Sequence, residues 1–383
     1  MKRPLKHYIR ECGARNKLRE CTAVYSVTNS QGFVPSTDYF SKEVYSKDLT
    51  NYKIVKRGMI AYNPSRVNVG SLAVQNAEEQ VIVSPLYVVI SVDETQLLPE
   101  YLCYFLHSDI GLKEIAAHTA GSVRDSLKFS ALQNIEITIR SVEEQRFIIR
   151  ILQKVEALIN KRRQTLNKLD DLVKSQFIEM FGNPEFNTHG LPLYKLGDLC
   201  NVGSSKRVYQ DEQSTEGIPF LRISDLCNKI DGNENSCELF IPEKVYASLK
   251  VAGLVPVAGD ILVTARGTLG RCYIIKESDR FYFQDGMITW LSELNEKVTS
   301  LYISHLFDSD GMKKQITSLQ AGSTVAYLSI AMTKKLNIML PPIEQQNEFA
   351  RFVEQTDKSK FRIKQNLEKL EILYKSLLQE YFG

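Results

Sequence analysis

The second half of this 383-residue chain repeats the first half at an offset of 201 residues, the separation of Gly182 from Gly383. Each of these glycines ends a similar motif, Glu-Met-Phe-Gly in the first half and Glu-Tyr-Phe-Gly in the second. Other pairs at the same offset are Gly58 and Gly259, Tyr101 and Tyr302, Gln145 and Gln346, and Arg150 and Arg351. So long a repeat exceeds the unit of a solenoid and indicates two domain-sized modules related by a pseudo-twofold axis. Because duplex DNA has its own dyad, such a chain suits DNA as a partner.

The composition excludes several classes of protein. With 43% hydrophobic and 24% charged residues, the chain is ordinary for a globular protein, and its formal net charge of +3 is only mildly basic. No apolar run reaches the length of a membrane span, and the first residues form no apolar signal segment. Seven cysteines without a C-x-x-C pair are typical of free thiols in a reducing compartment. We therefore expect a cytoplasmic protein with no membrane partner.

Two stretches with a heptad pattern predict long helices. Apolar residues recur at three- and four-residue steps within residues 142–182, interrupted by Arg162 and Gln176. The same register returns within residues 343–383, where Lys360 occupies an apolar position. Neither stretch contains Pro or Gly before its final glycine, so each is expected to form one continuous helix. We expect the two helices to pack antiparallel as a coiled coil; packing of each against a globular domain alone is the alternative.

The remaining residues, 1–141 and 183–342, predict two mixed α/β globular domains, giving an α+β fold class. Strand-like runs at residues 81–83, 87–90 and 260–263 are punctuated by turn signals such as Asp-Gly and Ala-Gly. The helices keep their register across the repeat, whereas the domains differ in length and sequence. We therefore expect specificity to reside in the domains.

The two domains also open alike. Pro4 matches Pro192 at an offset of 188, and the offset reaches 201 at Gly58 and Gly259. On this alignment the second domain carries 13 extra residues in that interval, the difference between the two offsets.

Several short segments of the chain are motifs that can be compared with those of known families. They are residues 218–226, 264–270 and 340–346, with weaker counterparts at residues 62–66 and 142–145. Together with the repeat, this set resembles the specificity subunit of a type I restriction-modification system, and the resemblance covers essentially the whole chain. It implies two target-recognition domains, each reading one half of a split DNA target. It also implies that the helices act as spacers between the domains.

The resemblance implies partners and cofactors as well. We expect double-stranded DNA and two adenine-N6 methyltransferase subunits, joined by two ATP-driven restriction subunits in the restricting complex. S-adenosylmethionine, ATP and Mg²⁺ are then expected in those subunits, and no cofactor is expected in this chain.

A glycine-bracketed turn at residues 264–270 follows a predicted strand in the second domain. Arg266 can donate two hydrogen bonds to a guanine edge or bind phosphate, and Thr268 can bond backbone oxygens. Arg271, which follows the turn, completes this candidate set. A surface β-turn with a solvated arginine fits the residues equally well.

The first domain has a corresponding turn that contains Asn63, Ser65 and Arg66. An Asn side chain there suits recognition of adenine. The alternative is that Pro64 simply makes this turn rigid.

A repeated Ala-Gly-Ser motif supplies the further candidates Ser122, Arg124, Ser323 and Thr324. Small residues would let backbone amides and the serine hydroxyls reach phosphate, with Arg124 adding charge. Because Val325 stands where the repeat would place a second arginine, the charged role belongs to the first module only. A helix N-cap beside a glycine is the alternative.

Arg222 and Ser224 alternate with apolar residues, which predicts a strand with both side chains on one face, toward solvent or DNA. Basic residues at 161–163 and 358–360 lie in the middle of the predicted helices. These could pass near phosphates, but a solvated helix face, or one that docks the methyltransferase, is favoured.

The sequence contains no recognisable catalytic motif. It has no G-x-x-x-x-G-K-[ST] phosphate loop, and its five histidines are scattered without metal-ligand spacing. The Asn63-Pro64 dipeptide begins like the loop of amino-methyltransferases but lacks the aromatic residue that stacks on a flipped base. We therefore expect a non-catalytic DNA-recognition subunit. The alternative is the recognition part of a fused DNA methyltransferase or nuclease.

Overall fold

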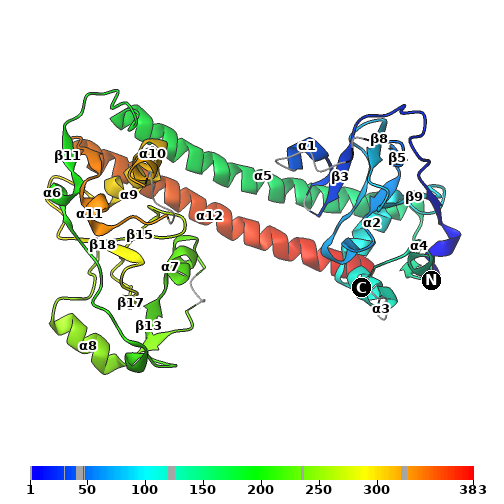
Figure 1. The fold of residues 1–383 in the computed structure, drawn as a ribbon. Helices are drawn as coiled ribbons and strands as arrows, with labels where there is room; N and C mark the ends of the chain where they lie inside the picture. Colours follow the sequence, from blue (N-terminus) through cyan, green and yellow to red (C-terminus); the bar gives the residue numbers. More distant parts are fainter. Residues whose placement is uncertain are drawn as a thin grey trace. The chain divides into compact units, whose positions relative to one another are not determined.

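The computed structural model describes residues 2–29, 31–39, 46, 48–119, 126–233, 237–320 and 326–383. It divides into two compact units: unit 1 is Met1–Gln164 with Ile363–Gly383, and unit 2 is Thr165–Arg362. Each unit holds one globular domain together with one end of each long helix (Figure 1).

Unit 1 is built on a four-stranded antiparallel sheet with the strand order β2-β9-β6-β7. These strands are β2 (Ile9–Cys12), β9 (Val88–Val92), β6 (Ile60–Tyr62) and β7 (Leu72–Val74). Three further strand pairs are β1 (Lys2–Pro4) with β10 (Glu136–Thr138), β3 (Tyr25–Thr28) with β4 (Gly32–Pro35), and β5 (Lys53–Lys56) with β8 (Gln80–Val83). The short helices are α1 (Ser36–Tyr39), α2 (Pro99–His107), α3 (Asp109–Thr119) and α4 (Phe129–Leu132).

Unit 2 repeats the four-stranded sheet in the order β12-β18-β15-β16. These strands are β12 (Asn201–Gly203), β18 (Ile288–Ser292), β15 (Ile261–Thr264) and β16 (Cys272–Ile274). The β1 and β10 pair is matched by β11 (Leu193–Lys195) with β19 (Asn337–Met339). The helices that surround this sheet are α6 (Leu196–Leu199), α9 (Ser300–Asp308), α10 (Asp310–Ser318) and α11 (Ile330–Lys334).

The two units differ most in the interval that precedes β6 in unit 1 and β15 in unit 2. Unit 2 there carries α7 (Ile223–Ile230), α8 (Glu243–Val251) and strands β14 (Phe240–Ile241) and β13 (Ile218–Leu221), which form a second sheet with β17 (Tyr282–Phe283). This part has a separate small core that includes Phe220 and Tyr246. The repeat therefore combines a shared sheet with a divergent insertion.

A buried glutamine joins the helix to the globular domain in unit 1. The Gln145 amide oxygen accepts a hydrogen bond from the Leu98 backbone N–H at 2.8 Å. Its amide nitrogen donates to the carbonyl oxygens of Gln96 and Arg140 at 2.8 and 3.0 Å.

The equivalent glutamine of unit 2 makes the same three bonds. Gln346 accepts from the Thr299 N–H at 2.9 Å and donates to the carbonyl oxygens of Lys297 and Pro341, both at 2.9 Å. Each of the four residues lies 201 positions after its counterpart in unit 1. The repeat found in the sequence is thus reproduced in the three hydrogen bonds of this glutamine.

The heptad pattern corresponds to two 40-residue helices, α5 (Val142–Phe181) and α12 (Ile343–Phe382). Helix α5 starts with a capping box, because the Glu144 carboxylate accepts from the Ser141 N–H at 2.9 Å and the Ser141 hydroxyl accepts from the Glu144 N–H. It ends at Gly182, whose φ of +81° is the left-handed conformation common after a helix. Among the described residues, no helix is both long and apolar enough to cross a membrane.

The two long helices pack antiparallel, as expected. In unit 1 the Tyr374 hydroxyl donates to Glu156 at 2.7 Å and Arg163 pairs with Glu371 at 2.6 Å, so positions rise along α5 as they fall along α12. In unit 2, Lys360 pairs with Asp170 on α5 at 2.7 Å.

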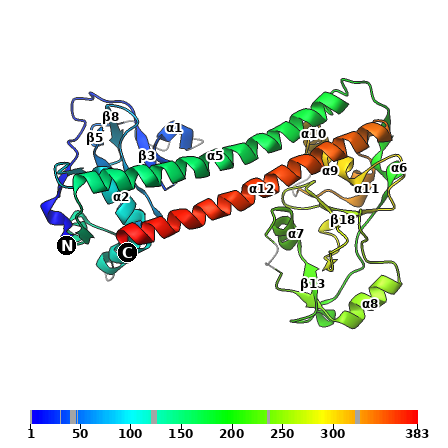
Figure 2. The ribbon, with the colours of Figure 1, turned by 180° about the vertical axis from the view of Figure 1, so that it is seen from behind.

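The helices pack on the globular domains as well as on each other, so neither helix packs on a domain alone. The Phe382 ring lies 5.0 Å from the Tyr101 ring in unit 1, and Phe181 lies 5.1 Å from Tyr302 in unit 2. Figures 1 and 2 both show the end of α12 beside α2. Each helix end therefore belongs to the core of one unit.

The predicted alignment of the domain starts was wrong. Lys2 pairs with Thr138, whereas Leu193 pairs with Met339, which lies 201 residues after Thr138. Lys2 therefore corresponds to Leu193, an offset of 191 rather than 188. The second domain carries 10 extra residues in the interval, the difference between 201 and 191. Strand register sets this alignment, and a shared Pro-Leu dipeptide carries too little information to override it.

Candidate nucleic-acid interface

Two turns occupy the same place in the repeated sheet. Turn 1, residues 63–71, joins β6 to β7, and turn 2, residues 265–271, joins β15 to β16. Gly70 and Gly270 stand at equivalent points near their ends, with φ of +90° and +78°. A Cβ at Gly270 would also approach the Ile316 side chain to 2.8 Å. Both turns thus have a glycine where the left-handed backbone requires one.

The backbone neighbour of each turn is also repeated. The Leu127 N–H donates to the Pro64 carbonyl at 3.0 Å, and the Leu328 N–H donates to the Ala265 carbonyl at 3.0 Å. Both the donors and the acceptors are separated by 201 residues. The segment after the Ala-Gly-Ser motif therefore lies beside the turn in both units.

Turn 1 is stabilised from within by Asn63. Its side-chain oxygen accepts from the Ser65 N–H at 3.1 Å, and its carbonyl accepts from the Arg66 N–H at 3.0 Å. Pro64 occupies the second position of this β-turn, which its fixed φ suits. The Asn63 oxygen is therefore engaged in the turn, while the side chains of Ser65 and Arg66 are exposed.

Turn 2 is stabilised by a threonine instead. The Thr264 hydroxyl donates to the Thr268 carbonyl at 2.5 Å and accepts from the Arg271 N–H at 3.0 Å. Arg266 and Thr268 are exposed at its tip. The Arg266 guanidinium carbon lies 4.9 Å from the centroid of the Tyr327 ring, which is a cation–π distance.

The other two candidate arginines of unit 2 are paired with carboxylates. Arg271 bonds Asp231 through both terminal nitrogens and holds the pKa of that carboxyl below its usual range. Arg222 pairs with Asp225 and Glu238, at 3.1 Å each. Their charge is therefore largely matched by the protein itself.

The predicted strand at Arg222 and Ser224 was wrong. Strand β13 ends at Leu221, and Arg222 is the N-cap of α7. The Asp225 carboxylate accepts from the Arg222 N–H at 2.9 Å, which stabilises the first turn of a helix. Ser224 is exposed in that turn. The carboxylate three residues after the N-cap was the signal that the apolar alternation concealed.

The candidates Ser122, Arg124, Ser323 and Thr324 lie outside the described residues. In the basic helix stretches, Arg163 pairs with Glu371 and Lys358 pairs with Glu354 on its own helix at 2.7 Å. Arg163 thus links the two long helices, whereas Lys358 pairs within α12.

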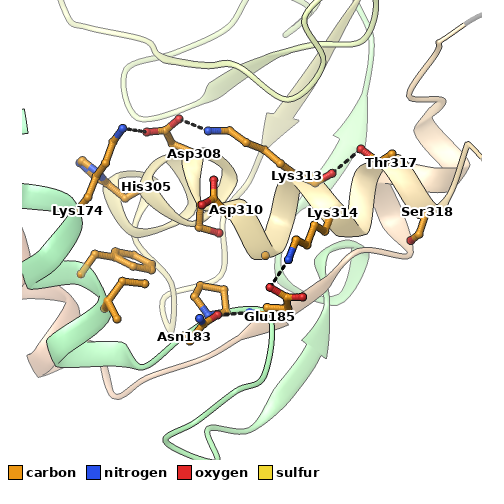
Figure 3. Close-up of a pocket in the computed structure, with 15 residues that line it drawn as sticks. Lys174, Asn183, Glu185, His305, Asp308, Asp310, Lys313, Lys314, Thr317 and Ser318 are labelled. Carbon is orange, nitrogen blue, oxygen red and sulfur yellow. Dashed lines mark hydrogen bonds and ion pairs between the residues drawn. The ribbon is translucent and has the colours of Figure 1, made fainter. Parts of the chain in front are cut away.

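A cavity of about 830 Å³ lies in unit 2 between the end of α5, residues 183–185, and helices α9 and α10 (Figure 3). Its cations are paired: Lys313 and Lys174 contact Asp308 at 2.8 and 3.9 Å, and Lys314 contacts Glu185 at 2.6 Å. None of the predicted site residues lines it. No group of three or more metal-ligating side chains occurs among the described residues.

The sequence matches a known family model in two places. The model of the type I restriction modification DNA specificity domain matches residues 28–169 and 192–372, which together cover most of the chain. The chain belongs to this family. Each matched range contains one of the two turns, and the resemblance noted in the sequence is confirmed.

Individual relatives agree with this assignment. The chain is 26% identical over 232 residues to a protein of Haemophilus influenzae described as a type I restriction enzyme specificity subunit, covering 60% of this chain and 57% of that protein. It is 25% identical over 275 residues to the type I restriction enzyme MjaVIII specificity subunit of Methanocaldococcus jannaschii, covering 66% and 63%. The matches thus span less than two thirds of these relatives.

Solved structures confirm the fold class. The S subunit of a type I restriction-modification system from M. genitalium has a TM-score of 0.57 and 16% identity, with coverage of 100% of this chain and 96% of that chain. A chain solved for the assembly and conformational transition of the type I R-M system has a TM-score of 0.56 and 15% identity, covering 100% and 97%. The α+β arrangement of two domains with two long helices is therefore a fold shared with these structures.

Proposed function

We propose that this chain is the non-catalytic DNA-recognition subunit of a type I restriction-modification complex and reads a bipartite, asymmetric target. Residues 1–141 and 183–342 are the two target-recognition domains, and each reads one half-site. Residues 142–182 and 343–383 are the spacer helices that set the gap between the half-sites. Family membership supports the general role, and the repeat supports the division of labour.

The observation that carries the proposal is the pair of turns. They share strand connectivity, a left-handed glycine and a backbone hydrogen bond, yet they present different side chains: Ser65 and Arg66 in turn 1, Arg266 and Thr268 in turn 2. Arginine favours guanine, whereas serine and threonine accept several bases. Two different readers on one repeated scaffold give two different half-sites.

The remaining candidates have graded roles in this proposal. Arg222 and Arg271 hold the recognition surface in place through their ion pairs with neighbouring carboxylates. Asn63 shapes turn 1, and its amide nitrogen is the part that faces DNA. Ser122, Arg124, Ser323 and Thr324 contact phosphates.

The partners follow from the same role. Two methyltransferase subunits bind the chain and carry S-adenosylmethionine, and two restriction subunits with ATP and Mg²⁺ join them in the restricting complex. The assembly works on chromosomal and invading DNA in the cytoplasm.

Methyl transfer from a labelled donor tests the proposal. The isolated chain should bind target duplex but transfer no methyl group, and adding its methyltransferase subunits should give methylation at one adenine in each half-site. Methylation by the chain alone would favour the other candidate, a fused methyltransferase.

A further inference from the structure

We infer that Tyr327 is a positioning residue that orients Arg266 to read a guanine in the half-site of unit 2. Positions 266 and 327, with their counterparts 65 and 126, then form one specificity-determining place present in both units. This inference rests on the proposed function and names the residue pair that sets part of its specificity.

The geometry fixes the guanidinium from one side. Arg266 and Tyr327 face each other across an isolated antiparallel bridge, and the guanidinium carbon lies 4.9 Å from the ring centroid. A guanidinium that lies over an aromatic ring can keep N–H donors directed away from that ring. That is the donor arrangement that fits the O6 and N7 atoms of guanine.

The electrostatics leave this arginine available for DNA. Across the described residues no carboxylate forms an ion pair with Arg266, in contrast to Arg222 and Arg271. A stacked ring lowers the entropy cost of ordering a long side chain without neutralising its charge. Of the three candidate arginines in unit 2, Arg266 is thus the one prepared for a base.

The repeat shows that this place varies while the backbone does not. The offset of 201 places Ser65 at the position of Arg266 and Ser126 at the position of Tyr327. The backbone hydrogen bond beside the pair is 3.0 Å long in both units. A cation on an aromatic ring in one unit corresponds to two short hydroxyl side chains in the other. The two units therefore present different hydrogen-bonding groups to DNA at this place.

The test uses the full chain assembled with its methyltransferase subunits and duplexes that contain its mapped target. Each guanine is replaced in turn by 7-deazaguanine, which lacks the N7 acceptor. In the wild-type complex, replacing one particular guanine of the unit 2 half-site should lower the affinity for DNA about tenfold. Arg266→Ala should abolish that sensitivity, and Arg266→Lys should abolish most of it, because an ammonium does not match the bidentate geometry.

Tyrosine variants separate positioning from structural support. Tyr327→Phe keeps the ring and should retain the tenfold sensitivity. Tyr327→Leu should retain binding to the other half-site but lower the sensitivity to about twofold or less. The leucine keeps an apolar side chain at this half-buried position, so the complex can be compared folded. Ser126→Ala, the matched control in unit 1, should leave the unit 2 sensitivity unchanged.

The outcomes are distinguishable. Full sensitivity in Tyr327→Leu would overturn the inference. Full sensitivity in Arg266→Ala would also overturn it, because another group would then read the guanine. Full sensitivity in Arg266→Lys would overturn the bidentate contact. A wild-type complex in which no guanine of that half-site responds would also overturn it, while leaving the bipartite target intact. A complex that methylates no split target at all would refute the proposed function itself.

Discussion

Two equivalent side-chain amides help to join the globular domains to the long helices. Gln145 and Gln346 are almost fully buried, and each satisfies one backbone donor and two backbone acceptors. A buried backbone N–H or C=O group without a hydrogen-bond partner destabilises the fold. These amides supply such partners, which an apolar side chain of similar size cannot do. Their role is structural, although the sequence showed them only as a matching pair.

Replacing Gln346 by leucine should lower the stability of unit 2 by about 3 kcal/mol, since three hydrogen bonds are lost and their backbone partners stay buried. Hydrogen exchange resolved by unit measures this, because the loss should appear in unit 2 and not in unit 1. Gln145→Leu should show the converse. The exposed Gln345→Leu is the matched control, and equal effects of Gln345→Leu and Gln346→Leu would contradict the assignment.

His305 should make unit 2 sensitive to acid. Burial lowers the pKa of this imidazole, while Asp308 and Asp357 raise it and Lys360 lowers it further, with burial the largest cause. The folded state therefore favours neutral His305, so its contribution is present above the unfolded pKa of about 6.5 and is lost as pH falls below that value. His305→Phe should lose less stability than wild type between pH 7.5 and 5.5. An unchanged pH profile in His305→Phe would refute the prediction.

At the scale of elements, the polar contacts between the long helices differ between the units. Glu156 accepts hydrogen bonds from Tyr104 and Tyr374, each at 2.7 Å, in unit 1. At an offset of 201 residues, Tyr104 corresponds to His305, Glu156 to Asp357 and Tyr374 to Val173. These three side chains cannot reproduce the arrangement. The apolar seam of the helices is repeated, whereas its polar contacts are specific to each unit.

The local patterns of the sequence were sufficient to predict the two long helices, the presence of two globular domains and the two turns. A period of three to four residues without Pro or Gly needs no knowledge of the partner helix. Contacts between distant segments were not accessible in this way. Tyr327 lies 61 residues from Arg266, and only the pairing of turn 2 with the segment after the Ala-Gly-Ser motif reveals their contact. The position of Tyr327 relative to that repeated motif was the available signal.

Lengthening the helices should change the gap between half-sites. Seven residues inserted after Thr165 in α5, with seven inserted after Gln365 in α12, preserve the apolar register and add about 10 Å, roughly three base pairs. The target mapped for this variant should keep its half-site bases and gain spacing. Insertion in α5 alone should change the gap or abolish assembly. An unchanged gap in the double variant would mean that the helices do not set the spacing.

At the scale of the molecule, the residues near both chain ends lie within unit 1. The strand that begins at Lys2 pairs with Thr138, and the Arg140 guanidinium donates to the Tyr381 carbonyl at 3.1 Å. The chain therefore leaves unit 1 along α5 and returns to it along α12. Both ends of the two-module chain thus belong to the same unit, which we call the circular connectivity.

A circular permutant should therefore retain function. Joining Gly383 to Met1 through a short linker and opening the chain after Gly182 should give a protein that directs methylation to the same target, because no packed element is cut. A permutant that folds and binds the methyltransferase but fails to direct methylation would count against the circular connectivity.

The half-chain 1–182 should pair with a copy of itself, since the seam of each helix can cover an identical seam. Such a dimer should direct methylation to a palindrome built from the first half-site. Light scattering and methylation mapping of this fragment test the prediction. Aggregation through the exposed seam, without a defined dimer, would contradict it.

The central claim is that two different domains on one repeated scaffold read two different half-sites. Mapping every methylated adenine in the genome of a host without other adenine methylation, with this chain and its methyltransferase present, tests it most directly. We predict a single motif of two unlike half-sites separated by a fixed gap of unspecified bases. A continuous motif, or a palindromic one from the intact chain, would contradict the account.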